Sequence, residues 1–569
     1  MSSAIHRSPL PDVALLDLDL ISYLFSNPYN VSRDRTIFID AVSGRSHTYD
    51  DVLQRTRSLA SGLRQLGVQT GDTVAMMCPN SIDYPIICYG IIGAGATVSP
   101  SNATYTSEEV HHQLQTTGAK YLIVHSSLAQ TVKDAVKGTA VQKVILQTGN
   151  DNPPAMDGVM MPTIEDLMAQ KPTKDLVITP SALLDERSAF ICFSSGTTGP
   201  AKGVITTHRN IVANLQQWDA HSTHGGAKLP TASVAFLPFS HIYAISYFVC
   251  GAFLRGMKTA VMASFDLDVF LNSIQTVQPE ELAVVPPIVL LLVKDPRVEK
   301  YDLSSVRTIL SAAAPLSKEL AEALEGRFRK LYGTTVYCHQ SYGLTETSPL
   351  VSRVSPERMV DKRHTVGCIT PNMQFRFIDS ETMQDVDMTI QDNGQLPLAE
   401  ILCRGPNVTK GYLGNESATK DLFHVDSNGD KWMRTGDIAT IDQDGYITIH
   451  DRIKELIKYK GHQVIPSELE GKLLEHSDVD DCGVTSQYIE DQATELPVAF
   501  VVLTAEARSQ PQNAVAMNLN QWINERVAHH KRLRGGIRFI DAIPKSPSGK
   551  ILRRKLKELV TRDRGASKL

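Results

Sequence analysis

A repeated order of helix, glycine and strand in the first part of the chain restricts the fold more than any other feature. In "YDDVLQRTRSLASGLRQLG" (49–67), apolar side chains recur at helical spacing and the segment ends at a glycine. The strand-like run "TVAMMC" (73–78) follows, and residues 81–100 and 106–125 repeat the same order. This alternation is typical of a parallel sheet covered by helices, so it predicts an α/β fold.

The pattern changes beyond about residue 370, where short alternating strands and glycine turns replace the helix–strand units. "QFRFID" (374–379) and "GYITIHD" (445–451) are examples, and they predict a β-rich subdomain. The chain has 569 residues, and single hydrophobic cores seldom grow past roughly 250–300 residues. We therefore expect at least two folding units.

The composition is that of a globular protein in a reducing compartment. The net charge of −5 argues against a general nucleic-acid or membrane role. None of the eight cysteines forms a CxxC pair, so neither a zinc site nor a disulfide framework is indicated. The apolar run "VVPPIVLLLV" (284–293) is too short to span a bilayer, and we interpret it as a buried segment.

The C-terminal region, residues 529–569, is strongly basic, with 13 Lys or Arg and 3 Asp or Glu. Three interpretations stay open: a solvated amphipathic helix, a cationic cap over a polyanionic ligand, or a nucleic-acid surface. The last is least favoured because aromatic residues are not interleaved with the basic ones. Ser567-Lys568-Leu569 is the tripeptide of a peroxisomal address. We therefore expect a peroxisomal matrix protein that binds the peroxisomal import receptor.

The loop "FSSGTTGPAKGV" (193–204) has the composition of a phosphate-binding loop. It follows the strand-like "AFICF" (189–193), and its glycines allow backbone N–H groups to turn towards an anion. Lys202 adds a mobile positive charge. The pattern matches neither the P-loop motif GxxxxGK[ST] nor the dinucleotide motif GxGxxG. The hydroxyl groups that can donate to phosphate oxygens are those of Ser194, Ser195, Thr197 and Thr198.

This loop resembles the phosphate loop of the adenylate-forming, AMP-binding enzyme superfamily. Four further stretches fit the superfamily in order: "SYGLTET" (341–347), "RTGD" (434–437), "DRIKELIKYKGHQV" (451–464) and "PKSPSGKILRRKL" (544–556). Within the superfamily, "PFSHIYAIS" (238–246) is most similar to 4-coumarate-CoA ligases and to fungal aryl-CoA ligases such as phenylacetyl-CoA ligase.

The resemblance implies a two-domain, ATP-dependent acid–CoA ligase. Residues 1–450 would form the AMP-binding domain, residues 451–453 would start a hinge segment with the hinge at Lys454, and residues 455–566 would form a small mobile α+β domain, followed by the tripeptide 567–569. A carboxylate would attack the α-phosphate of ATP, giving acyl-AMP and pyrophosphate, and CoA would then displace AMP. The implied cofactors are ATP, Mg²⁺ and the co-substrate CoA.

The resemblance also implies roles for the first step. Lys550 would bridge the carboxylate and the α-phosphate, Asp437 would hold the ribose, and Tyr342 would stack on adenine. Glu346 and Thr198 would hold Mg²⁺. The full set implied for ATP or AMP is Ser194, Ser195, Gly196, Thr197, Thr198, Gly199, Lys202, Ser341, Tyr342, Gly343, Thr345, Glu346, Asp437, Arg452 and Lys550.

A second set is implied for the acid and for thioester formation. His241 would act as a gate between the acid and the nucleotide, and Lys458 would replace Lys550 after domain rotation. Lys460 and Gly461 would lie along CoA. The implied acyl-binding residues are His241, Tyr243, Ala314, Ser341 and Gln463. The wider pocket candidates, whose small and apolar character suits a ring or an alkyl chain, are Tyr243, Tyr247, Ala312, Ala313, Ala314, Ser341, Leu350 and Val351.

Two departures from the ligase pattern leave the acid open among aryl, arylalkanoic and medium-chain types. Ser341 stands where coumarate ligases usually have glycine, and Ser264 stands where the family often has a CoA-facing lysine. Two other activities also stay open: a luciferase-like oxygenase, and an adenylation enzyme that loads a carrier protein. A non-catalytic scaffold is disfavoured because the residues for which chemistry is implied are intact.

Overall fold

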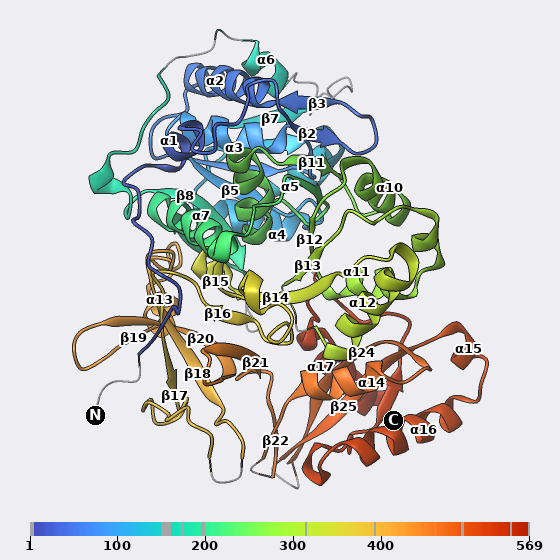
Figure 1. Cartoon of the computed structure of the whole chain (residues 1–569). Helices are drawn as coiled ribbons and strands as arrows, with labels where there is room; N and C mark the ends of the chain where they lie inside the picture. Colours follow the sequence, from blue (N-terminus) through green and yellow to red (C-terminus); the bar gives the residue numbers. More distant parts are fainter. Residues whose placement is uncertain are drawn as a thin grey trace.

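The computed structural model describes residues 5–148, 161–169, 171, 175–194, 200–312, 314, 316–391, 394–460, 462–490, 494–546 and 549–566, the last six without their side chains. Figure 1 shows a large α/β body, a β-rich part that continues from it, and a smaller C-terminal unit. This confirms the predicted class, a mixed α/β fold with a large N-terminal and a small C-terminal domain. Residues 149–160 and the tripeptide 567–569 lie outside the described residues.

The first sheet of the large body has six strands in the order β7-β6-β4-β5-β8-β9. All neighbours are parallel except β8 and β9, which pair antiparallel on either side of the phosphate loop. The strands are β4 (Thr73–Met77), β5 (Thr97–Ser101), β6 (Tyr121–His125), β7 (Lys143–Gln147), β8 (Ser188–Ser194) and β9 (Lys202–Thr207). The phosphate loop therefore starts at the carboxyl end of a buried strand, as predicted.

Local sequence signals set the helices beside this sheet. Helix α2 (Tyr49–Leu66) begins at a capping box on Thr48 and ends at Gly67, whose φ of 109° places it in the left-handed region. The predicted helix over 49–67 is confirmed. The other helices of this part are α1 (Leu20–Phe25), α3 (Tyr84–Gly93), α4 (Ser107–Thr117), α5 (Ala129–Ala135), α6 (Ile164–Met168) and α7 (His208–Ser222).

A second sheet has the order β10-β11-β2-β3. Helices follow its strands along the chain and lead to a third sheet. The strands are β2 (Thr36–Asp40), β3 (Ser46–Thr48), β10 (Ala232–Ala235) and β11 (Lys258–Val261). The helices that follow are α8 (Ile242–Ala244), the π-helix η4 (Ile245–Gly251), α9 (Ala252–Arg255), α10 (Leu267–Val277), α11 (Pro286–Lys294) and α12 (Lys318–Tyr332). The run 284–293 thus lies at the end of a strand and in α11, with Val284, Val289 and Leu292 buried. Across the described part of the chain, every helix is too short or too polar to cross a bilayer.

The third sheet joins the α/β body to the β-rich part. Strands β12, β13 and β14 are parallel, and pairing becomes antiparallel from β15 onward. The change therefore begins near residue 350, earlier than the expected change near 370, because a short turn leads from β14 directly into β15. The strands are β1 (His6–Arg7), β12 (Glu281–Val284), β13 (Thr308–Ser311), β14 (Tyr337–Gly343), β15 (Leu350–Arg353), β16 (Gly367–Ile369), β17 (Gln374–Ile378), β18 (Ala399–Arg404), β19 (Phe423–Val425), β20 (Lys431–Ile441) and β21 (Tyr446–Arg452), with helix α13 (Glu416–Leu422).

The C-terminal unit has its own apolar core, which includes Leu469, Val484 and Leu519. A hairpin of β22 (Ile457–Tyr459) and β23 (His462–Val464) comes first, followed by a three-stranded sheet of β24 (Val479–Ile489), β25 (Thr494–Leu503) and β26 (Ile537–Phe539). The helices are α14 (Pro466–Leu474), α15 (Ala505–Arg508), α16 (Gln512–Arg526) and α17 (Arg553–Ala566). Lys454 is exposed in the turn between β21 and β22. The boundary at 450 and the hinge at Lys454 stay predictions.

Candidate active site

Three residues of the implied nucleotide set meet at the end of β14. The register of β20 and β21 pairs Asp437 with Arg452, and the Arg452 Nε donates to the Asp437 Oδ1 at 3.0 Å. The Tyr342 hydroxyl donates to the Asp437 Oδ2 at 2.6 Å. The carboxylate of Asp437 raises the pKa of Arg452, and burial together with that carboxylate raises the pKa of Tyr342. The cluster thus presents a buried, oriented carboxylate, which suits a pair of ribose hydroxyls.

Lys550 comes to this cluster from the C-terminal unit. A turn at Gly549, with φ of 82°, positions it, and the Ser546 N–H donates to the Lys550 carbonyl at 2.7 Å. Burial lowers the pKa of the Lys550 ammonium, Arg452 lowers it further, and Glu455 and Asp437 oppose the shift. The structure therefore brings the implied catalytic lysine and the implied ribose-binding carboxylate together, although 113 positions separate them.

The phosphate loop contributes a second polar cluster around Glu346, in the short helix η6 (Thr345–Thr347). The Glu346 Oε1 accepts from the Ser194 Oγ at 3.2 Å and from the Tyr412 hydroxyl at 2.9 Å. The Lys202 Nζ lies 4.6 Å from the centre of the Tyr412 ring. Thr345 precedes Glu346 in the same short helix. Residues 195–199, which include the other loop residues of the implied set, lie outside the described residues.

Gly343 allows the chain to turn from β14 into this helix. A Cβ atom at Gly343 would lie 2.1 Å from the carbonyl oxygen of Pro349, which is backbone and cannot yield as a side chain would.

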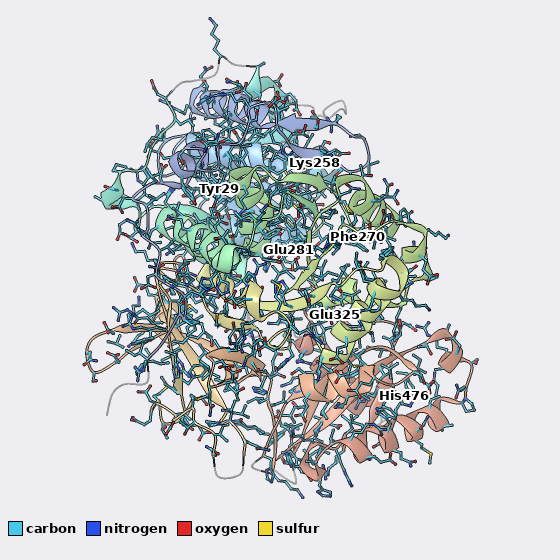
Figure 2. The ribbon with its side chains drawn as sticks, in the orientation of Figure 1. Tyr29, Lys258, Phe270, Glu281, Glu325 and His476 are labelled. Atoms are coloured by element: carbon cyan, nitrogen blue, oxygen red, sulfur yellow. The ribbon has the colours of Figure 1, made fainter. Side chains whose placement is uncertain are left out.

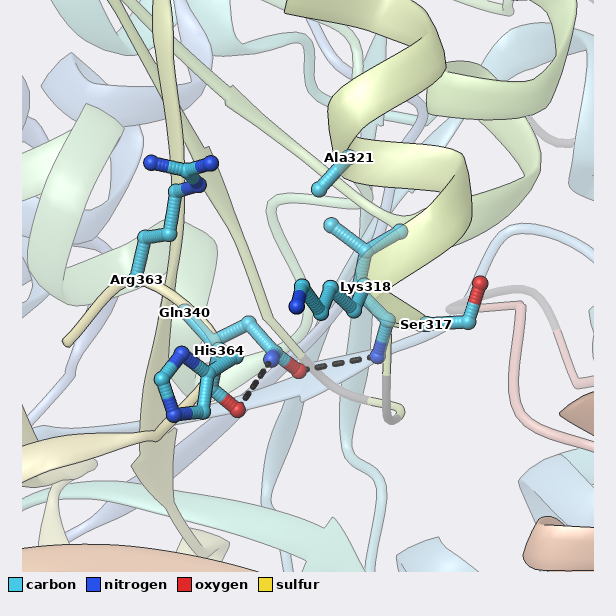
Figure 3. A pocket seen from close by; sticks show the side chains of 7 residues that line it. Ser317, Lys318, Ala321, Gln340, Arg363 and His364 are labelled. Carbon is cyan, nitrogen blue, oxygen red and sulfur yellow. Dashed lines mark hydrogen bonds between the residues drawn. The ribbon is translucent and has the colours of Figure 1, made fainter. Parts of the chain in front are cut away.

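Gln340 precedes Ser341 in β14, and its side chain faces the opposite side of the strand because side chains alternate along a strand. Its amide oxygen accepts from the Leu316 N–H at 2.8 Å, and its amide nitrogen donates to the His364 carbonyl at 3.5 Å. Dashed lines mark these hydrogen bonds in Figure 3. These two hydrogen bonds therefore hold the strand that carries Ser341 and Tyr342 on the side opposite Ser341.

Of the implied acid-binding residues, Ser341 lies in β14, and His241 and Tyr243 lie at the start of α8. His241 caps α8, where its Nδ1 accepts from the Tyr243 N–H at 3.3 Å. Burial lowers the pKa of His241 to about 4, so the ring is neutral at pH 7. Ser341 is buried in β14 and pairs with Arg353 of β15. Tyr243 is buried nearby, and its hydroxyl has no hydrogen-bond partner among the described residues.

A buried ion pair lies next to the pocket candidate Tyr247. The mostly apolar character of the pocket candidates did not predict this pair. Glu281, which Figure 2 shows inside the large body, pairs with the guanidinium of Arg353. It also accepts from the Tyr247 hydroxyl at 2.8 Å, while the Arg353 Nη1 donates to the Ser222 Oγ at 2.8 Å. Burial acts to raise the pKa of Glu281, but the charge of Arg353, together with smaller contributions that include the Tyr247 hydrogen bond, lowers it overall. Leu350 and Val351, by contrast, are buried and apolar as expected. Of the small candidates, Ala312 is buried and Ala314 partly so, and Ala313 lies outside the described residues.

The residues implied for the second step are not part of these clusters. Lys458 and Gln463 face each other across the β22–β23 hairpin, and both are exposed. Lys460 is exposed at the turn, and Gly461 lies outside the described residues. Among the described residues, no hydrogen bond or ion pair links this hairpin to Asp437 or Lys550. The structure thus brings together several of the described residues implied for the first step and leaves Lys458, Lys460 and Gln463 exposed.

Comparison with known families identifies the chain. A family model described as "AMP-binding enzyme" matches residues 25–413. The chain belongs to this family. A second model, "AMP-binding enzyme C-terminal domain", matches residues 468–550. The division between the two matches agrees with a large and a small unit in an AMP-binding enzyme.

Curated relatives of this AMP-binding enzyme are acid–CoA ligases. The chain is 35% identical over 562 residues to 4-coumarate–CoA ligase 2 of Petroselinum crispum, covering 97% of this chain and 96% of the relative. It is 31% identical to peroxisomal OPC-8:0-CoA ligase 1 of Arabidopsis thaliana, covering 98% and 95%. The predicted resemblance and the predicted enzyme class, an AMP-forming acid–CoA ligase, are confirmed.

Solved structures support the fold. An anthranilate CoA ligase in complex with anthranoyl-AMP has a TM-score of 0.82 at 20% identity and covers 97% of this chain and 99% of its own. A benzoate CoA ligase from Burkholderia xenovorans LB400 has a TM-score of 0.79 at 22% identity, covering 95% and 99%. At these identities the likeness concerns the fold alone.

Sequence reasoning missed several residues that the structure places at the site. Tyr412 contacts both Glu346 and Lys202, Glu455 faces Lys550, and Glu281 pairs with Arg353. Only the "KGYLG" turn around Tyr412 carried a local signal, an aromatic residue between two glycines. Such a turn is common in loops, so it did not point to the phosphate loop.

Proposed function

We propose that this AMP-binding enzyme activates a carboxylic acid with ATP and transfers it to CoA in two steps. The observation that carries the proposal is the electrostatic interaction of the Lys550 ammonium with Asp437 and Arg452, because a positive charge within range of a ribose site can act on the α-phosphate. The acid is an aryl, arylalkanoic or medium-chain carboxylic acid. The activities for which two relatives are named, those of a coumarate ligase and an OPC-8:0 ligase, support this range.

In the first step, the protein must bring two anions together and stabilise the charge that develops on the phosphate oxygens. Lys550 supplies a positive charge at the reacting end of ATP, and Lys202 with the phosphate loop binds the pyrophosphate end. His241, neutral at pH 7, separates the acid from the nucleotide without adding charge. Tyr342, Asp437 and Arg452 hold the adenosine.

Glu346 fits the role of a Mg²⁺ ligand. Its Oε1 accepts two hydroxyl donors, and among the described residues its carboxylate forms no ion pair, so it remains available to an oxygen-preferring cation. Thr198, its proposed partner, lies outside the described residues. When bound, Mg²⁺ would neutralise part of the triphosphate charge.

In the second step, the C-terminal domain rotates about Lys454 and exchanges Lys550 for Lys458. Lys458 and Gln463 then lie at the acyl-adenylate, and Lys460 and Gly461 lie along CoA. The exposed hairpin and the position of Lys454 in a turn support this proposal, because few contacts oppose a change of backbone angles there.

A screen of carboxylic acids with ATP, Mg²⁺ and CoA tests the function. We expect an acid-dependent release of pyrophosphate and a CoA thioester detected by its mass. Pyrophosphate release without a thioester in the presence of CoA would contradict the ligase proposal and favour carrier loading. Light emission with luciferin and ATP would favour the oxygenase.

We also propose that the protein works in peroxisomes. One relative is named peroxisomal, and the sequence carries Ser567-Lys568-Leu569. A fluorescent protein fused to the N-terminus should co-localise with peroxisomes, and removal of residues 567–569 should leave it in the cytosol. Peroxisomal import of the truncated fusion would contradict this assignment.

A further inference from the structure

Tyr412 lies on a segment that binds tightly to the strand following the phosphate loop. The Ile205 N–H donates to the Gly411 carbonyl at 3.0 Å, and the Leu413 N–H donates to the Gly203 carbonyl at 2.8 Å. Tyr412 itself forms the bridge to β9 between these two bonds. The segment therefore pairs with the free edge of β9, and these hydrogen bonds fix its backbone relative to the strand that follows the phosphate loop.

The same segment fixes Glu346 at two points. The Thr409 N–H donates to the Glu346 carbonyl at 2.8 Å, which holds the backbone. The Tyr412 hydroxyl donates to the Glu346 Oε1 at 2.9 Å, and the Ser194 Oγ donates to the same oxygen at 3.2 Å. Both donors lie on Oε1, which sets the rotation of the carboxylate. Within the described part of the chain Oε2 accepts no hydrogen bond, so it can take another ligand.

The ring of Tyr412 acts on a second group. The Lys202 Nζ lies 4.6 Å from the ring centre, within the distance of a cation–π contact. A lysine has four rotatable side-chain bonds, so a fixed aromatic surface removes much of its freedom. One tyrosine thus contacts the implied metal ligand through its hydroxyl and the implied phosphate-binding cation through its ring.

We propose that Tyr412 is a positioning residue that orients Glu346 and Lys202 towards the triphosphate of ATP. The proposal rests on the proposed function, since it assumes that ATP binds at this loop. The hydroxyl aims the Glu346 carboxylate at the Mg²⁺ position, and the ring aims Lys202 at the β- and γ-phosphates. Tyr412 acts through these two side chains and does not touch the nucleotide.

The two contacts can be separated by two substitutions. Tyr412→Phe removes the hydroxyl and keeps the ring, whereas Tyr412→Leu removes both. Tyr446→Phe is a matched control, because its hydroxyl bonds to the Ser355 Oγ at 2.6 Å and its ring lies 5.3 Å from the Arg358 guanidinium, away from the loop. Thermal unfolding of all variants shows whether the fold is kept.

Two measurements give different expected patterns. In acid-dependent ATP–pyrophosphate exchange, Tyr412→Phe should raise the Mg²⁺ concentration for half-maximal rate by about tenfold, since a hydrogen bond to a carboxylate is lost. In calorimetric binding of ATP with EDTA and no metal, Tyr412→Phe should match the unsubstituted protein. Tyr412→Leu should weaken this metal-free binding by about fivefold through Lys202. Tyr446→Phe should change neither quantity.

Three results would overturn the proposal. One is an unchanged Mg²⁺ dependence in Tyr412→Phe, and another is unchanged metal-free ATP binding in Tyr412→Leu. The third is equal weakening of metal-free binding by both substitutions, which would place the hydroxyl on the nucleotide itself. Failure of the proposed function is distinguishable, because then the unsubstituted protein makes no CoA thioester with any acid, whatever the metal-free binding of ATP shows.

Discussion

At the scale of single residues, burial decides which groups carry charge. His221 and His339 are completely buried, and burial with the nearby Arg353 lowers the pKa of each to about 3. The ordinary pKa of histidine is about 6.5, so the unfolded chain binds two protons between pH 6.5 and pH 3 that the folded chain does not. The free energy of unfolding must therefore fall as the pH falls through this range, by up to about 1.4 kcal/mol per pH unit for each histidine.

Substitution of one of these histidines tests that dependence. His339→Gln should reduce the slope of unfolding free energy against pH between pH 6 and pH 4 by about 1.4 kcal/mol per unit, whatever it does to the absolute stability. Urea unfolding at several pH values measures the slope. His529→Gln, at an exposed position, is the control and should leave the slope unchanged. Equal slopes in all three proteins would show that His339 is not buried as a neutral group.

At the scale of elements, the turn between β14 and β15 depends on a residue without a side chain. Gly343→Ala would place a Cβ atom 2.1 Å from the Pro349 carbonyl oxygen, so the end of β14 and the start of β15 must separate, which displaces η6 between them. We expect a loss of about 3 kcal/mol in unfolding free energy and a raised KM for ATP, since Glu346 moves with η6. Gly326→Ala in α12, where no atom lies within 4 Å of the new methyl group, should instead stabilise by about 0.5–1 kcal/mol. A Gly343→Ala protein as stable as the original would refute the close contact.

Particular elements show which parts of the fold and of the site the sequence could predict and which it could not. Local signals, such as Thr48 and Gly67 around α2, predicted helices and strands correctly. Family motifs predicted Tyr342, Asp437 and Arg452, which the structure brings into contact. The pair of Glu281 with Arg353 was not predictable, because it depends on the register of four strands, β12 to β15, and no local pattern fixes that register.

At the scale of the whole molecule, the structure holds the domains in an arrangement suited to one of the two proposed steps. Lys550 interacts electrostatically with Asp437 and Arg452, Gly549 approaches Pro287 of α11, and the hairpin with Lys458 is exposed. A single arrangement cannot present both lysines to the same acyl-adenylate. The two half-reactions should therefore respond in opposite ways to substitution of the two lysines.

Lys550→Ala should reduce acid-dependent pyrophosphate release by about 100-fold to 1000-fold, since one charge contact in the transition state is lost. The same protein should still form the thioester from CoA and preformed acyl-AMP, because we propose that this step uses Lys458. Lys458→Ala should show the reverse pattern, and Lys555→Ala, at an exposed position of α17, should affect neither step. Single-turnover assays of each half-reaction separate these cases. Equal loss of both steps in Lys550→Ala would mean that one arrangement of the domains serves the whole reaction, and the exposed hairpin would then need another role.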